Sequence, residues 1–320
     1  MRGARTSTPR CRGTELSVAG PLLVGAAGVL GAVGILTRWR ARVARRFEAG
    51  DLARRPRDAN GVVVGAAAFR LEHPGTDRAV LVLHGFNDTP QSMRHLAMRL
   101  HEAGYTVHVP RLPGHGGSLR ELAADARAPR WRRATERALA DLRRSHRHVF
   151  VCGQSMGGAL TVELAAAHPD LPAVALLAPF IGLDPAMERR FRLARLSPVP
   201  YLRSPGAERS IHDPEARRQA LGPGVVTARA LLALRDVALR AESLLARVQV
   251  PCLYVQSVHD NRVSEAFGLR HFKAIAATEK MQLWLSGSGH IISADYEKDV
   301  VADAVIAWFG DALARRSRSG

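Results

Sequence analysis

Short β-rich runs alternate with longer segments of helical periodicity along most of the chain. The runs predict strands at 62–71, 79–84, 106–110, 148–152, 173–178, 252–256 and 281–285. The segments between them predict helices at 92–103, 130–145, 156–168, 265–277 and 295–315. Several runs are almost wholly apolar, as strands are when both faces of a parallel sheet are buried. The alternation therefore predicts an α/β fold with a mostly parallel sheet of about eight strands and helices on both faces.

Residues 182–248 break this alternation. They contain several prolines, no convincing strand and a long helical stretch at 227–248. A helical insertion here would lie over the carboxyl ends of the strands, where open parallel sheets bind their ligands. The segment is therefore predicted to be an inserted helical cap that shapes a substrate pocket, and the core is predicted to comprise residues 58–181 and 249–315.

A second exception is the uncharged apolar stretch at 16–37, which lies within a basic N-terminal region, residues 1–57. At about 1.5 Å per residue, a helix of this length would cross a bilayer core of about 30 Å. Arginines flank the stretch on both sides, which suits anchoring at the two interfaces. The stretch predicts a single membrane anchor, and the slight excess of arginine after it favours a cytoplasmic position for the rest of the chain. A cleaved signal peptide of a secreted protein and a weakly apolar linker are the alternatives.

The positive charge of the chain is concentrated in its N-terminal region. The chain of 320 residues carries a formal net charge of +17, and the first 57 residues hold twelve arginines and three acids. Elsewhere basic residues are not interleaved with aromatic ones and no DNA-reading helix is recognisable, which argues against a nucleic-acid partner. Cys11, Cys152 and Cys252 are widely separated and match no metal-binding or disulfide spacing. We therefore expect neither a metal site nor a disulfide framework.

The strongest chemical signal is the sequence Gly-Gln-Ser-Met-Gly at 153–157. It stands between a predicted strand and a predicted helix, and Gly153 and Gly157 allow the sharp turn that presents Ser155 in a strained, exposed position. The bare motif is only moderately specific, and an ordinary Gly-Ser turn is the alternative. Its position between strand and helix makes Ser155 a candidate nucleophile.

A serine hydroxyl needs a base, and a histidine oriented by an acid supplies one. Asp260 lies just past the strand at 252–256, and His290 lies in a glycine-rich loop after the strand at 281–285. The chain order serine, acid, histidine is the order of hydrolases built on this kind of sheet. An ordinary turn-forming aspartate is the alternative for Asp260. His259 competes as the base, but it precedes the acid, which is the wrong order.

Acyl transfer also needs hydrogen-bond donors where a carbonyl oxygen becomes an oxyanion. The backbone N–H of Met156 is one candidate, because it follows the nucleophile and opens a helix. The N–H of Phe86, in the sequence His-Gly-Phe at 84–86 after the strand at 79–84, is the second. The alternative for this sequence is a tight strand-to-helix turn.

Taken together, five segments resemble the carboxylesterase and monoacylglycerol lipase branch of the bacterial α/β-hydrolases: HGF at 84–86, PGHG at 113–116, GQSMGG at 153–158, HDNRV at 259–263 and SGHIISADYEKD at 288–299. The resemblance covers residues 79–312, and the cap matches only in length and position. It implies a cofactor-free serine esterase of the EC 3.1.1 type acting on small-molecule or lipid esters. It also implies a triad of Ser155, Asp260 and His290 and an oxyanion hole formed by the amides of Phe86 and Met156. The apolar stretch at 16–37 departs from the soluble members.

Two other functions stay open at this point. The same fold and triad support thioester, lactone or carbon–carbon bond hydrolysis, because neither fixes the substrate. An inactive membrane-tethered scaffold is the other alternative, although the loss of a triad member would be its usual mark and all three are present. A cap rich in leucine, valine and phenylalanine favours medium acyl chains or glycerides. The sequence leaves the oligomeric state open.

Overall fold

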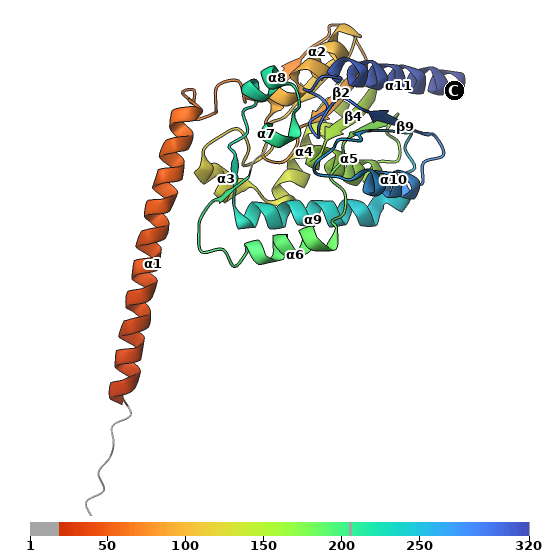
Figure 1. Ribbon diagram of the computed structural model, residues 1–320. Coiled ribbons are helices and arrows are strands. Elements are labelled where there is room, and N and C mark those ends of the chain that lie inside the picture. Colours follow the sequence, from red (N-terminus) through yellow and green to blue (C-terminus); the bar gives the residue numbers. More distant parts are fainter. Residues whose placement is uncertain (1–18, 205–206, 320) are drawn as a thin grey trace, which may run out of the picture. The chain divides into compact units, whose positions relative to one another are not determined.

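A seven-stranded sheet forms the centre of the computed structural model, which describes residues 19–204 and 207–319 (Figure 1). The strand order is β1-β3-β2-β4-β5-β8-β9. All neighbouring pairs are parallel except β1 and β3, which are antiparallel. The strands are β1 (Phe69–Leu71), β2 (Arg78–Leu83), β3 (Thr106–Val109), β4 (His148–Gln154), β5 (Val174–Leu177), β8 (Cys252–Ser257) and β9 (Lys280–Leu285). The predicted α/β fold with a mostly parallel sheet is confirmed.

The first strand is shorter than predicted. Residues 62–68 form turns and an isolated bridge between Arg57 and Val63 instead of continuing β1. Gly65 has a φ of +87° there, a left-handed conformation that does not fit a strand. The sheet has seven strands in the described chain, where about eight were predicted.

Helices cover both faces of the sheet. Along β2, Leu81 and Leu83 face one hydrophobic cluster, and Val80 and Val82 face the other. On the first face lie α3 (Leu119–Asp125), α4 (Ala128–Arg143), α5 (Met156–Ala167), α9 (Ala228–Leu244) and α10 (Glu265–Ala274). On the second lie α2 (Arg94–Glu102) and α11 (Lys298–Ser319), which lie next to each other (Figure 1).

The segment between β5 and β8 is mostly helical. It contains α6 (Pro185–Ala194), β6 (Leu202–Arg203), α7 (Ala207–Ser210), α8 (Pro214–Gln219), β7 (Val225–Val226) and α9. The strands β6 and β7 form a two-residue antiparallel ladder, which the sequence did not predict. Buried residues of α9 such as Val237 and Ala241 join the first hydrophobic cluster, while α6 has no buried residue and packs on α9. The inserted segment is thus fixed to the core through α9.

The membrane anchor predicted at 16–37, and the localisation built on it, are wrong. Residues 16–18 lie outside the described residues, and the remainder belongs to α1 (Ala19–Arg54). Within the described chain, no helix is long and apolar enough to cross a membrane. Glycine and alanine fill much of the stretch and contribute little insertion free energy, and arginines begin at Arg38.

The chain divides into two units, residues 1–43 and residues 44–320. Within the second unit, the last turns of α1 contact the inserted segment. The buried Asp51 binds Arg55 (Nε to Oδ1, 2.8 Å) and Arg57, and Arg55 also donates to the carbonyl oxygen of Leu221 at 2.9 Å. The Tyr201 hydroxyl donates to Glu48 at 3.1 Å. Part of the basic N-terminal region is therefore internal structure of this unit.

Candidate active site

Ser155 alone makes the turn between β4 and α5. Its φ of 56° and ψ of −116° lie outside the regions that non-glycine residues prefer, a strain of about 1–3 kcal/mol. Hydrogen bonds hold it there: its N–H donates to the carbonyl of Leu177 at 2.9 Å, and its carbonyl accepts from Ala159 and Phe180, each at 3.0 Å. The fold therefore imposes the strain and holds the hydroxyl in place.

The glycines on either side allow this turn through close packing. A Cβ atom on Gly153 would overlap the carbonyl oxygen of Gly157, and one on Gly157 would overlap the carbonyl oxygen of Leu83. Both neighbours are backbone atoms, so they cannot move aside without moving α5 or strand β2. The predicted role of Gly153 and Gly157 in the turn therefore has a steric basis in the structure.

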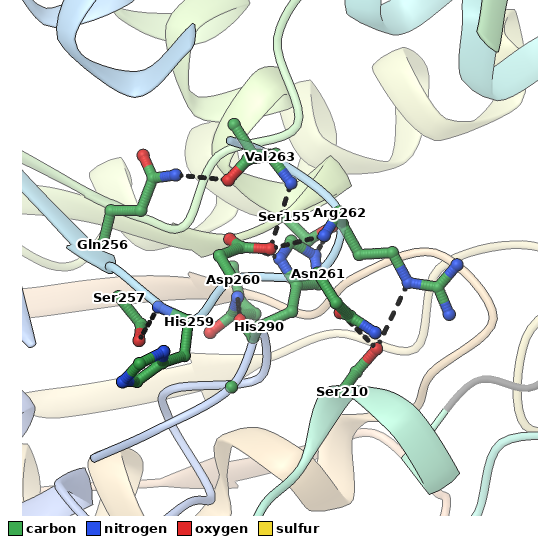
Figure 2. A network of polar contacts seen from close by, with 12 residues as sticks. Ser155, Ser210, Gln256, Ser257, His259, Asp260, Asn261, Arg262, Val263 and His290 are labelled. Atoms are coloured by element: carbon green, nitrogen blue, oxygen red, sulfur yellow. Dashed lines mark hydrogen bonds and ion pairs between the residues drawn. The ribbon is translucent and has the colours of Figure 1, made fainter. Parts of the chain in front are cut away.

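The structure brings Ser155, His290 and Asp260 together, as Figure 2 shows. Ser155 Oγ lies 2.8 Å from Nε2 of His290, and Nδ1 of His290 lies 2.8 Å from Oδ2 of Asp260. The side chains of His290 and Asp260 are only 7% and 0% exposed. Proton transfer from the serine to the imidazole can therefore occur within a single line of hydrogen bonds.

Asp260 is fixed by the loop that follows β8. Its Oδ1 accepts from the N–H groups of Arg262 at 2.7 Å and Val263 at 3.0 Å, which leaves Oδ2 facing the imidazole. Gln256, at the end of β8, donates to the carbonyl of Val263 at 2.7 Å and closes the loop. His259, the competing base, is exposed and points away from Ser155 (Figure 2). The geometry thus selects His290 as the partner of the serine.

Several residues that hold the His290 loop had no predicted role. Gln154 donates to the carbonyl of His290 at 2.9 Å. The buried Asp295 accepts from Gly289 at 2.8 Å, and Glu297 accepts from the N–H groups of residues 286–288. These acids lie in the quoted segment SGHIISADYEKD, and their position shortly after His290 was the available signal. They fix the loop from within the same stretch of chain.

The loop after β2 is held by a buried histidine. His84 Nε2 accepts from the N–H of Leu112 at 3.1 Å, so its Nδ1 carries the proton and donates to the carbonyl of Gly85 at 2.9 Å. Burial lowers the pKa of His84 to about 3, so the ring stays neutral. Burial likewise lowers the pKa of His115, whose ring meets that of His84 edge to face, to about 4. His84 thereby positions Gly85 and Phe86 next to Ser155.

The two residues predicted to supply oxyanion donors both lie near the nucleophile. Met156 directly follows Ser155 as the first residue of α5. Phe86 follows Gly85, where an added Cβ would lie 3.3 Å from the Cβ of Ser155. Phe86 and Ser155 line the same cavity. The positions are compatible with the predicted role, which stays a prediction.

A cavity of about 170 Å³ opens above Ser155 and His290. The apolar residues of its lining are Phe180, in the loop after β5, and Met187, Phe191, Leu231 and Leu234, from α6 and α9. The other part is polar and includes Asn87, Asp88, Ser210 and Arg262. The cavity can therefore take a molecule with one apolar and one polar end.

No cluster of three or more His, Cys, Asp or Glu side chains is arranged to hold a metal in the part of the chain that is described. Cys152 and Cys252 are buried free thiols in β4 and β8, and burial raises the pKa of both. Cys11 lies outside the described residues. That the cysteines bind no metal stays a prediction from the sequence.

A mostly parallel seven-stranded sheet with a strained strand–serine–helix turn at its carboxyl edge defines the class of α/β-hydrolases. Within that class, the chain belongs to the family described as serine aminopeptidase, S33, whose model matches residues 74–297.

Relatives and solved structures agree with this assignment. The chain is 30% identical to the thermostable monoacylglycerol lipase of Bacillus sp. (strain H-257), over 78% of this chain and 96% of the relative. It is 27% identical to a carboxylesterase of Bacillus subtilis (strain 168), over 71% of this chain and 90% of the relative. A solved structure from a study of two metagenome-derived lipolytic enzymes is similar with a TM-score of 0.71 and 32% identity, over 78% of this chain and 99% of that one.

Proposed function

We propose that this protein is a serine hydrolase that cleaves carboxylic esters through Ser155, His290 and Asp260. The observation that carries the proposal is the unbroken hydrogen-bonded line from Asp260 through His290 to Ser155. The description of the family names a peptidase, but both relatives carry the names of ester hydrolases. The enzyme is therefore a carboxylic ester hydrolase of the carboxylesterase or monoacylglycerol lipase type.

In the proposed reaction, Nε2 of His290 takes the proton of Ser155 while Oγ attacks the ester carbonyl carbon. The N–H groups of Phe86 and Met156 stabilise the negative oxygen of the tetrahedral intermediate. His290 then gives its proton to the leaving alcohol oxygen, and the acyl group stays on Ser155. Water, deprotonated by His290, attacks the acyl-enzyme and releases the acid. Asp260 holds the imidazole in the tautomer that these steps need. No cofactor takes part in them.

The walls of the cavity favour esters with an apolar acyl chain. The apolar part of the wall comes mainly from α6 and α9, which project residues such as Met187 and Leu231 into the cavity. In the proposed organisation, residues 182–248 act as a cap over the core, formed by residues 58–181 and 249–315. Small-molecule esters or single-chain lipid esters are the substrate class that this arrangement fits.

Replacement of Ser155 by alanine tests the proposal. With p-nitrophenyl esters from acetate to palmitate, Ser155→Ala is expected to lower kcat/KM by about 10⁴-fold or more, because no other group supplies the nucleophile. Ser145→Ala, on a partly exposed hydroxyl after α4, is the matched control and should retain wild-type turnover. Wild-type turnover in Ser155→Ala, or no labelling of the wild-type protein by a fluorophosphonate, would contradict the proposal.

A further inference from the structure

The end of α1 forms a buried polar cluster that the proposed reaction does not use. Asp51 is 0% exposed and Arg55 is 8% exposed, and Asp51 pairs with both Arg55 and Arg57. These residues precede residue 74, where the match to the family model begins. Removing an ion pair from water costs about as much free energy as the attraction returns, so net stability alone does not account for the cluster. The directions of its hydrogen bonds indicate another role.

Arg55 connects the end of α1 with the inserted segment. Its Nε and Nη2 donate to Oδ1 of Asp51 at 2.8 Å and 2.5 Å, and its Nη1 donates to the carbonyl oxygen of Leu221 at 2.9 Å. The guanidinium group is planar and rigid, so the two bonds to Asp51 fix the direction of the third. Asp51 therefore orients Arg55, and Arg55 holds the chain at Leu221.

A second set of contacts fixes the end of α1 itself. Oε1 of Glu48 accepts from the hydroxyl of Tyr201 at 3.1 Å, and its Oε2 accepts from Nε of Arg120 at 3.0 Å. The ring of Phe47 lies 5.8 Å from the ring of Tyr201, centroid to centroid. Arg55 therefore extends from a helix end that is already attached to other parts of the same unit, so it can transmit that position to Leu221.

Gly222, which follows Leu221, lies against the loop after β2. A Cβ atom on Gly222 would lie 2.5 Å from the carbonyl oxygen of Asn87, so only glycine permits this approach. Asn87 has a φ of 59°, a left-handed conformation that asparagine tolerates but does not favour. Arg55, Pro223 and Asn87 also border one small space beside His115. The contact with Gly222 therefore limits how the backbone at Asn87 can relax.

Phe86, whose N–H is a proposed oxyanion donor, directly precedes Asn87. On its other side, His84 holds the carbonyl of Gly85 at 2.9 Å. The short loop of Phe86 is thus held at Gly85 from within the core and at Asn87 from Gly222. An oxyanion donor must lie within hydrogen-bonding distance of the developing charge, and a misplacement of about 1 Å can cost about 10²-fold in rate.

We propose that Arg55 is a positioning residue of the active site: through Leu221 and Gly222 it holds the loop that carries Phe86. The inference rests on the proposed ester hydrolysis and on the proposed oxyanion donors. Arg55 does not line the cavity above Ser155. Its loss should therefore leave substrate binding nearly unchanged and weaken the stabilisation of the oxyanion. Such an effect lowers kcat while KM changes little.

Arg55→Gln in the full-length protein tests the inference, because Asp51 keeps Arg57 as its partner in this variant. For p-nitrophenyl butyrate, we expect kcat per active site to fall by about tenfold to a hundredfold, with KM within about twofold of the wild-type value. Active sites are counted by complete reaction with a fluorophosphonate. Octyl trifluoromethyl ketone, which adds to a catalytic serine and forms an oxyanion, should show an inhibition constant raised by a similar factor.

Gly222→Ala disturbs the same contact from the other side and removes no charge. Its methyl group would press on the carbonyl oxygen of Asn87, so it should also lower kcat and weaken inhibition by the ketone. Arg54→Gln is the matched control for Arg55, because Arg54 is exposed and donates to the carbonyl of Gly50 in its own helix. Gly50→Ala, where nothing lies within 4 Å of an added Cβ, is the control for Gly222. Both controls should keep the wild-type kcat.

The possible results separate this inference from the proposed function. If Arg55 only stabilises the fold, Arg55→Gln unfolds at lower urea concentration but each counted active site keeps the wild-type kcat and inhibition constant, which overturns the inference. A raised KM with an unchanged kcat would place the effect in substrate binding and also overturn it. If Arg55→Gln yields no folded protein, Gly222→Ala decides, and an unchanged kcat per site in that variant overturns the inference. If the wild-type protein neither hydrolyses the butyrate nor reacts with the fluorophosphonate, the proposed ester hydrolysis fails first, and the role of Arg55 fails with it.

Discussion

Ser155 shows how strongly single residues are constrained at this site. Its positive φ persists because its own N–H and carbonyl groups are hydrogen-bonded. The close packing of the turn also requires glycine at positions 153 and 157, where a Cβ atom would overlap backbone atoms. These constraints concern the local chain, so the spacing of the glycines made the turn predictable from the sequence. The role of Gln154 was not predictable in this way, because it donates to the backbone carbonyl of His290, which lies far along the chain. The bonds of Asp295 to His212 and Asp213 were not predictable for the same reason, although its bond to Gly289 is local.

Gly157→Ala is expected to destabilise the protein by about 3 kcal/mol or more. The new methyl group would overlap the carbonyl oxygen of Leu83 and come within 2.8 Å of that of His84, and backbone atoms of a central strand cannot yield locally. Urea unfolding monitored by circular dichroism measures the effect. Gly310→Ala is the control, because nothing lies within 4 Å of a Cβ there, and helix propensity should make it neutral or slightly stabilising. Equal stability of the two variants would refute the steric argument.

Asp88 gives a second prediction at this scale, now for stability against pH. Because burial raises its pKa from 3.8 to about 6 in the folded protein, the folded state favours the protonated form. The stability that the protonated Asp88 contributes is therefore fully present below about pH 4, and it is lost as the pH rises through about 6.

Asp88→Asn should accordingly stabilise the protein at pH 8 by up to about 3 kcal/mol, and by about 1 kcal/mol or less at pH 4.5. Unfolding free energies of wild type and variant from urea titrations at both pH values check this. A difference that is the same at both pH values would show that Asp88 titrates normally. Asp311→Asn, with its exposed carboxylate, should show no such dependence.

At the scale of elements, Asp295 connects the inserted segment with the loop of His290. Its carboxylate accepts hydrogen bonds from the N–H groups of His212, Asp213 and Gly289, each at 2.8 Å, and of Tyr296 at 2.9 Å. The carbonyl of Ser210 accepts from the N–H of Ile291 at 2.9 Å and adds to this junction. The position of the proposed base therefore depends on an element that comes about eighty residues earlier in the chain.

Asp295→Asn is expected to destabilise the protein by about 2–4 kcal/mol, because the new amide group would face N–H donors and leave some of them unpaired. It should also lower kcat for p-nitrophenyl butyrate, since the His290 loop loses an attachment. Thermal unfolding and steady-state kinetics measure the two effects. Asp303→Asn, which removes an exposed ion pair with Arg99, is the control and should cost less than about 1 kcal/mol. A fully stable and active Asp295→Asn would show that the junction is held by other contacts.

The elements also show where sequence patterns are weak. The long helices α4, α5, α9, α10 and α11 were predicted, because apolar residues recur at helical spacing over several turns. The ladder of β6 and β7 was missed, because two-residue strands such as Val225–Val226 have no periodicity. The basic region before residue 57 was interpreted through its apolar stretch, whereas Asp51, Arg55 and Arg57 form a buried cluster that only tertiary contacts define.

At the scale of the whole molecule, the fold class followed from the alternation of strands and helices, but the strand order did not. Strand β2 lies between β3 and β4, and β5 pairs with β8 although more than seventy residues separate them in the chain. Such pairings depend on contacts between distant parts of the chain, which local patterns do not encode. The motifs named Ser155, Asp260 and His290, and the structure brings these side chains within hydrogen-bonding distance, because loops at the carboxyl ends of parallel strands meet at one edge of the sheet.

Residues of the segment between β5 and β8 line the cavity together with residues of the other loops. A substitution in that segment alone should therefore change the depth of the cavity. Leu231, in the first turns of α9, lines the apolar wall, and a tryptophan there would fill part of a space of about 170 Å³. Leu231→Trp is therefore expected to lower kcat/KM for p-nitrophenyl decanoate by about tenfold or more, and that for the acetate much less. Leu196→Trp, at a position that is 71% exposed and outside this cavity, is the matched control. If Leu231→Trp lowers acetate and decanoate equally, the acyl chain does not lie along α9, and the alcohol end must occupy the apolar wall instead.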